Sequence, residues 1–120
     1  MIVIKGKSEK SKHVENLIRK EFLTNNVVIV DAIGYNGWSE GNWSTIWTIN
    51  SKMSHNQVIA SFEDDYESFK KFDWVVFYIN SNNDSIDDFK ELDRKYPQNF
   101  IITIQSNEGL TTKYFIWVEI

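Results

Sequence analysis

Cysteine is absent from this sequence of 120 residues, and proline occurs only once. Without cysteine the chain has neither a disulfide framework nor a thiolate metal site, and this composition agrees with a reducing, cytoplasmic setting. Long apolar runs are also lacking, since none approaches the roughly 20 residues that a helix needs to cross a bilayer. We therefore expect a cytoplasmic protein that does not associate with membranes.

Positive charge is scarce as well. The sequence has 13 Lys and Arg residues against 17 Asp and Glu residues, which gives a net charge of −4 and a pI near 5.1. Broad binding to nucleic acid requires a basic surface, so direct nucleic-acid binding is not expected. The sequence also lacks a His-x-x-x-His pair, a serine nucleophile elbow and a recognisable catalytic triad. These absences favour a binding or interaction protein over an enzyme, and they offer no metal site.

Four short apolar runs are rich in β-branched residues and are predicted to be strands. They are residues 1–4 (MIVI), 27–30 (VVIV), 74–79 (WVVFYI) and 100–104 (FIITI). Runs that are apolar at every position are typical of strands buried on both faces of a parallel sheet. A fifth run, residues 114–120, contains Glu119 and is predicted to be an edge strand.

Helical periodicity separates these runs at residues 9–22, 54–72 and 85–96. Ser54 and Gln57 have the spacing of a capping box, and Pro97 is expected to end the third helix. Alternation of strand and helix predicts an α/β fold in three layers, with a mostly parallel sheet of about five strands and helices on both faces. We expect a single domain over residues 1–120.

One segment, residues 34–53, has no helical period and is predicted to be an insertion that holds a Gly-bent loop and a short strand or hairpin. Its loop GYNGWSEGNWS interleaves Tyr35, Trp38 and Trp43 with glycine and polar residues. Tyrosine and tryptophan supply large contact area at low entropic cost, which favours a protein-binding role for these three side chains. The alternatives are that they fold back as a lid over the core or that they stack on nucleic-acid bases.

The first predicted strand leads directly into a possible anion site. Gly6 follows the strand, and a helix is expected within a few residues, so the loop points backbone N–H groups at whatever lies above it. Gly6, four residues and then Ser11-Lys12-His13 parallels a phosphate loop, which reads Gly, four residues, Gly-Lys-Ser or Gly-Lys-Thr. Lys12 takes the position of the lysine that reaches the phosphates.

Two positions depart from that pattern. Ser11 adds a side chain where the second glycine would allow the backbone to come close. His13 replaces the hydroxyl that binds Mg²⁺, and neutral imidazole is a poor ligand for this hard cation. The stretch therefore predicts an anion-facing loop without ordinary magnesium chemistry. The alternative is a lysine-rich turn with no ligand.

Polar residues end the other predicted strands in a similar way. Asp31 follows the second run, Asn80 the third and Gln105 the fourth. Together with the first loop, this order resembles a small, degenerate P-loop NTPase domain of the RecA-like branch, with Gln105 as a sensor-type residue and a last strand able to form a hairpin.

The resemblance implies ATP or GTP as the ligand, with Gly6, Lys12, Asp31 and Gln105 at the site beside Ser11 and His13. Asp31 and Asn80 also have a simpler explanation as turn formers at strand ends. Two other classes remain open. One is a non-enzymatic interaction or inhibitor protein of bacterial or phage type, which would use the Trp-rich loop and the acidic surface. The other is a flavodoxin-like or receiver-like domain.

Overall fold

The computed structural model describes residues 1–6, 10–21, 26–32, 45–48, 54–79, 86–105 and 111–114, and these form an α/β fold. One sheet has the strand order β3-β2-β4-β5-β1-β6. Its strands are β1 (Ile2–Gly6), β2 (Val27–Asp31), β3 (Thr45–Thr48), β4 (Trp74–Tyr78), β5 (Asn99–Gln105) and β6 (Thr111–Tyr114). The four central strands are mutually parallel, β3 lies parallel to β2 at one edge, and β6 lies antiparallel to β1 at the other.

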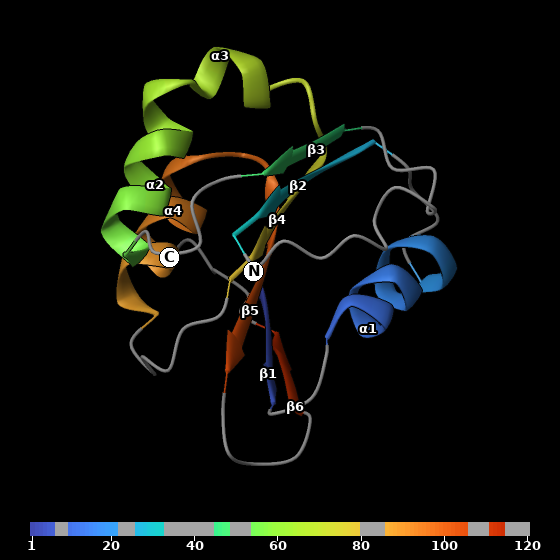
Figure 1. Ribbon diagram of the computed structural model, residues 1–120. Coiled ribbons are helices and arrows are strands. Elements are labelled where there is room, and N and C mark those ends of the chain that lie inside the picture. Colours follow the sequence, from blue (N-terminus) through green and yellow to red (C-terminus); the bar gives the residue numbers. More distant parts are fainter. Residues whose placement is uncertain are drawn as a thin grey trace, which may run out of the picture.

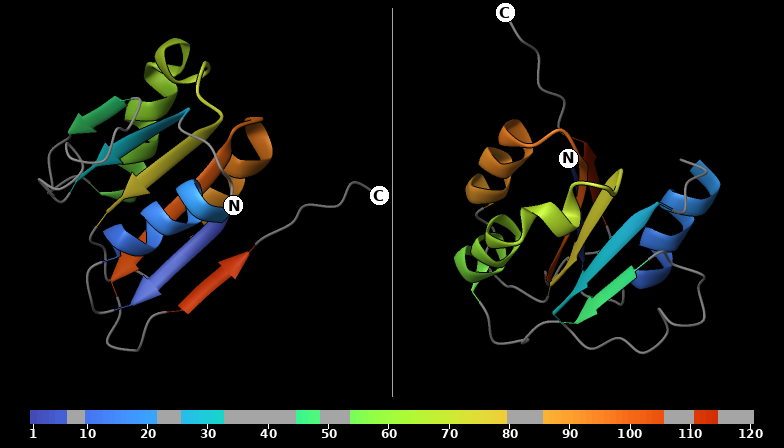
Figure 2. Two further views of the ribbon diagram at one scale, coloured as in Figure 1. Left: turned by 90° about the vertical axis from the view of Figure 1, so that its right-hand side faces the viewer. Right: turned by 90° about the horizontal axis from the view of Figure 1, so that it is seen from above.

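Helices cover both faces of this sheet (Figures 1 and 2). On one face lies α1 (Ser11–Asn16), which continues as a π-helical turn, η1 (Leu17–Glu21). On the other face lie α2 (His55–Asp64), α3 (Tyr66–Phe69) and α4 (Asp87–Lys95). The predicted mostly parallel α/β sheet with helices on both faces is therefore confirmed. The sheet has six strands rather than about five, because a four-residue strand is added at each edge of the parallel centre.

Alternate residues of the central strands enter two different cores. Ile2, Ile4 and Ile29 pack with Val14, Leu17 and Ile18 under α1 and η1. Their neighbours along the strands pack under α2, α3 and α4, among them Val3, Val28 and Val30. Because successive side chains of a strand point to opposite faces, a strand covered on both sides needs apolar residues at every position. This explains the continuous apolar runs of the sequence.

Aromatic rings dominate the larger core. The Phe62 ring of α2 lies 4.9 Å from the Phe69 ring, 5.8 Å from Phe77 and 5.7 Å from Phe100, measured between centroids. It also meets the Tyr96 ring edge-on at 5.3 Å. Such edge-to-face contacts add stability beyond the area that they bury. Phe62 thus joins α2 to α3, to two central strands and to the end of α4.

The predicted helix boundaries are largely confirmed by local contacts. Ser54 Oγ accepts a hydrogen bond from the Gln57 backbone N–H at 3.3 Å, and Gln57 Oε1 accepts one from the Ser54 N–H at 2.8 Å, which completes the capping box. The helix α4 ends at Lys95, and Tyr96 is extended with φ −117° and ψ 146°. A residue before proline is driven to this region, so Pro97 ends the helix as predicted.

Three predictions about elements need correction. Residues 54–72 form two helices, because Asp65 leaves the helical region with φ −121° and ψ 32°. The last strand is Thr111–Tyr114, so it begins before the predicted run, and residues 115–120 lie outside the described part of the chain. This strand pairs with β1 and not with β5, so the predicted terminal hairpin is wrong.

Candidate functional site

The carboxyl ends of the central parallel strands lie together at one end of the sheet, and three of the predicted site residues are found there. Gly6 ends β1 and Gln105 ends β5, and the two are directly paired in register. Asp31 ends β2, where it pairs with Tyr78 of β4. Since two strands separate β1 from β2 and neighbouring strands lie about 4.8 Å apart, Asp31 is roughly 14 Å from Gly6. The fold thus brings Gly6 and Gln105 together and leaves Asp31 apart.

Backbone pairing between β4 and β5 ends sooner than that between β1 and β5. The register of β4 and β5 stops at Phe77 and Ile102, whereas β1 and β5 stay paired as far as Gly6 and Gln105. Beyond that point the fully buried Thr103 hydroxyl links the two strands. Its Oγ1 lies 3.0 Å from the Ile79 nitrogen and 3.0 Å from the Ile79 oxygen. It accepts from the one and donates to the other, so a side chain replaces the backbone ladder.

The chain connections that follow β1 and β4, the two strands beside β5, lead to opposite faces of the sheet. The chain leaves β1 for α1 on one face of the sheet, whereas α4, which follows β4, lies on the opposite face (Figure 2). A crevice outside the carboxyl ends of parallel strands, where successive connections part to opposite faces, is the usual place for a ligand in an open α/β sheet. The carboxyl ends of β1 and β5 lie at such a point.

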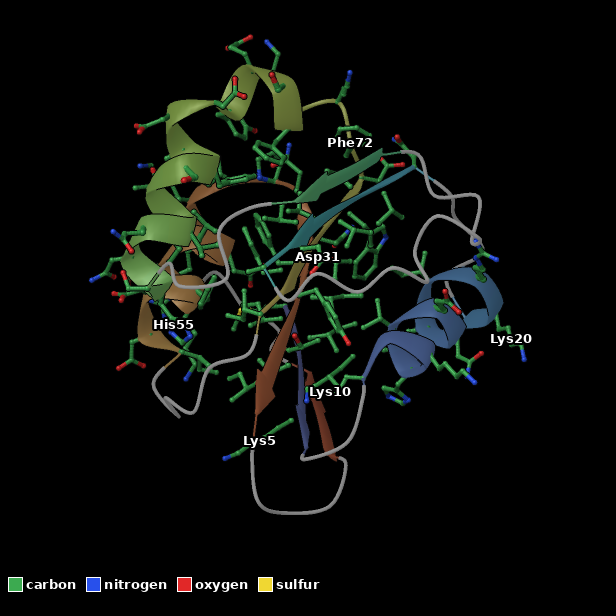
Figure 3. All side chains as sticks on the ribbon, viewed as in Figure 1. Lys5, Lys10, Lys20, Asp31, His55 and Phe72 are labelled. Carbon is green, nitrogen blue, oxygen red and sulfur yellow. The ribbon has the colours of Figure 1, made fainter. Side chains whose placement is uncertain are left out.

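The first loop contains a lysine that the sequence analysis passed over. Lys10 stands just before α1, and its Nζ donates a hydrogen bond to the Gly6 carbonyl oxygen at 3.0 Å. The residue is only 4% exposed, and this burial lowers the pKa of its ammonium group from the ordinary value. Figure 3 shows Lys10 near the carboxyl end of β1. The contact closes the turn between β1 and α1.

The predicted residues of the same loop have different surroundings. Lys12 is exposed on the first turn of α1, and His13 is half-buried. Ser11 begins α1, and its side chain lies outside the described part of the structure, as does that of Gln105. Of the two lysines that flank Ser11, it is therefore Lys10 that turns toward the end of β1. Spacing alone had pointed to Lys12.

The described lysines of the first loop and of the start of α1 are cationic. Lys10 places a buried ammonium group beside the Gly6 carbonyl, and Lys12 is exposed on the first turn of α1. Within the described ranges, no group of three His, Asp or Glu side chains could hold a metal ion.

A second polar cluster joins α2 to α4. Glu63 Oε2 accepts hydrogen bonds from Lys95 Nζ at 2.6 Å and from the Tyr96 hydroxyl at 2.8 Å. These two bonds lower the pKa of the Glu63 carboxyl, and Glu63 in turn raises the pKa of Lys95. The acidic residues that follow Glu63 along the chain, Asp64, Asp65 and Glu67, are exposed. Glu63 and Lys95 form an ion pair between α2 and α4, which indicates that this cluster has a structural role.

Tyr35, Trp38 and Trp43 lie outside the described residues, so their predicted role in partner binding stays a prediction. The structure does describe Thr45–Thr48 of that insertion, as the edge strand β3. The predicted short strand is thus confirmed. It pairs in parallel with β2, so the two strands do not form a hairpin.

Comparison with known proteins gives no relative, since no family model, no curated protein and no solved structure matches the chain. None of the helices in the described ranges is long and apolar enough to span a membrane.

Proposed function

We propose that the chain is a nucleotide- or phosphate-binding module of the cytoplasm, with ATP or GTP held at the carboxyl edge of β1 and β5. The carboxyl ends of β1 and β5 carry this proposal, because they lie beside the first loop and the chain connections that follow β1 and β4 part to opposite faces of the sheet. Gly6 ends β1 beside Gln105, and the lysines of the loop supply positive charge. The resemblance to a degenerate P-loop domain belongs to the same proposal.

The proposed role is binding without ordinary magnesium-dependent hydrolysis. His13 stands where the metal-binding hydroxyl would be needed, and it is a poor ligand for Mg²⁺. Asp31, the acidic residue that could hold the metal through water, ends β2, and two strands lie between β2 and β1. The proposed site would still bind phosphate, but it lacks the hydroxyl and the nearby carboxylate that usually hold Mg²⁺.

Thermal unfolding with added nucleotide tests this proposal directly. A ligand that binds only the folded chain at 100 times its Kd stabilises it by about 2.7 kcal/mol, which for a domain of this size raises Tm by roughly 10 °C. We expect ATP or GTP to raise Tm to this extent, equally with and without Mg²⁺.

Adenosine and guanosine are the matched controls, because they keep the base and sugar but lack phosphate. Neither should shift Tm. Unchanged unfolding with millimolar ATP and GTP would refute the proposal, and an equal rise with the nucleosides would show that phosphate is not what binds.

A further inference from the structure

Thr103 holds the backbone that follows β4 by means of its side chain. If the register of β4 and β5 continued by two more residues, Ile79 would lie opposite Ile104. Instead, the Ile79 N–H donates to Thr103 Oγ1 and the Ile79 carbonyl accepts from it, each at 3.0 Å between heavy atoms. One buried hydroxyl therefore fixes the place where the chain leaves β4.

This contact lies close to the strand ends where the ligand is proposed to bind. Thr103 pairs in register with Ile4, two residues before Gly6, and it stands two residues before Gln105 in its own strand. At about 3.3 Å per residue, the contact is roughly 7 Å along the strands from those ends.

The other side of β4 is held at the same level by its backbone. The Ala32 N–H donates to the Tyr78 carbonyl at 2.9 Å, which continues the pairing of β2 with β4. Since β4 lies between β2 and β5, the side chain replaces backbone pairing on the side of β4 that faces β5 and the proposed site.

We propose that Thr103 is a positioning residue of the phosphate site, which holds Ile79, and with it the end of β4, in the place that ligand binding requires. This inference rests on the proposed function. It adds a residue that acts on the ligand only through the backbone of Ile79.

Burial makes this contact rigid. Thr103 is fully buried, and a hydrogen bond is stronger in the low dielectric of a core than in water. Leaving either Ile79 group without this partner is costly, so the hydroxyl favours a single arrangement of the strand end. A backbone that is already fixed loses little freedom when a ligand binds beside it, and this increases affinity.

Isothermal titration of Thr103→Val and Thr103→Ser tests the inference, with inorganic triphosphate and ATP as probes at a temperature where each chain is folded. We expect Thr103→Val to weaken the binding of both probes by about fivefold or more, because it frees the Ile79 backbone. Thr103→Ser keeps the hydroxyl and should bind nearly as tightly as the unaltered chain. Unchanged affinity in Thr103→Val, or an equal loss in Thr103→Ser, would overturn the inference.

The control variant Ile101→Val separates positioning from a general loss of stability. It shortens a fully buried side chain two residues earlier in β5, so it should lower Tm. It keeps the Thr103 hydroxyl, so both affinities should stay unchanged. Equal weakening in Ile101→Val and Thr103→Val would contradict the inference, because affinity would then follow stability.

Backbone NMR of the unaltered chain gives a measurement that does not depend on how any variant folds. Titration with inorganic triphosphate should shift the amide signals of Gly6 and Ile79, and it should leave that of Val75, near the amino end of β4, nearly constant. A shift of Gly6 without a shift of Ile79 would refute the role of Thr103. The two proposals fail differently, because the function fails if neither probe binds the unaltered chain, whereas only the role of Thr103 fails if both probes bind Thr103→Val as tightly as the unaltered chain.

Discussion

Thr103 shows how a single hydroxyl can link two strands where their backbone pairing ends. It is the one polar residue in the run FIITI, and it is fully buried. Its hydroxyl accepts a hydrogen bond from the Ile79 N–H and donates one to the Ile79 carbonyl. At this point β4 and β5 are no longer paired through their backbones. A polar residue within an apolar strand was a signal that the sequence offered and that our sequence analysis did not use.

Thr103→Val should destabilise the fold, although the two side chains have nearly the same shape. Valine leaves the Ile79 N–H and carbonyl buried without this partner, which costs about 1–3 kcal/mol. Urea unfolding measures the loss. The matched variant Thr103→Ser keeps the hydroxyl and should retain the hydrogen bonds, so its unfolding free energy should exceed that of Thr103→Val. A Thr103→Val chain as stable as the unaltered one would show that the hydroxyl does not contribute to stability.

The first loop marks the limit of prediction from spacing. The sequence placed Gly6 correctly at the end of a buried strand and at the start of a strand–loop–helix unit. It could not tell which lysine turns toward that strand, because side-chain direction depends on the backbone torsions of the turn. Lys10 has φ −105° and ψ −3° there, and these values cannot be read from residue order.

Central and edge elements differed in how well the sequence predicted them. The central strands carry apolar residues at every position, and this signal located β1, β2, β4 and β5 to within one or two residues at each end. Edge strands are short and paired on one side only, so tertiary context fixes their limits and partners. For this reason the sequence missed the start of β6 and its pairing with β1.

The contact between α2 and α4 should make stability depend on pH in the acid range. Hydrogen bonds from Lys95 and Tyr96 depress the folded-state pKa of Glu63. A depressed carboxyl pKa contributes stability that is present above the unfolded value of about 4.3 and is lost as pH falls through the folded value. We expect Glu63→Gln to lower the unfolding free energy near pH 6 and to have little effect near pH 3, as measured by urea unfolding.

Lys95→Met is the control for that pH profile. It removes the ion pair but leaves the Tyr96 hydroxyl on Glu63, so it should reduce the dependence on pH only in part. A difference between Glu63→Gln and the unaltered chain that stays constant from pH 6 to pH 3 would show that the charge of Glu63 has no role in the contact.

At the scale of the whole molecule, the sheet separates two cores that share backbones but no side chains. One core lies under α1 and η1 and the other under α2, α3 and α4. Both pack against the same four central strands, so loss of one core exposes a complete face of the sheet. The continuous apolar runs predicted this division, but not how unevenly the helices are shared between the faces.

Hydrogen exchange should follow this arrangement. Amides of β4 and β5 lie furthest from the sheet edges and beneath helices on both faces, so they should open only with global unfolding. Amides of the edge strands β3 and β6 should exchange at least 100-fold faster, since they open locally. Mass spectrometry of the exchanging chain measures this difference. Equal protection of centre and edges would mean that a second copy or another chain covers the edges.

The uneven division of the helices also bears on how this protein would misfold. Among the described elements, α1 with its π-helical turn is the only helical cover of one face. Undocking of that single unit would expose an apolar, largely β-branched surface that runs across the four central strands, with Ile29, Val76, Ile101 and Ile4 among its residues. Surfaces of this kind attract one another between molecules. Aggregation should therefore begin on the α1 face while the aromatic core on the other face is still folded.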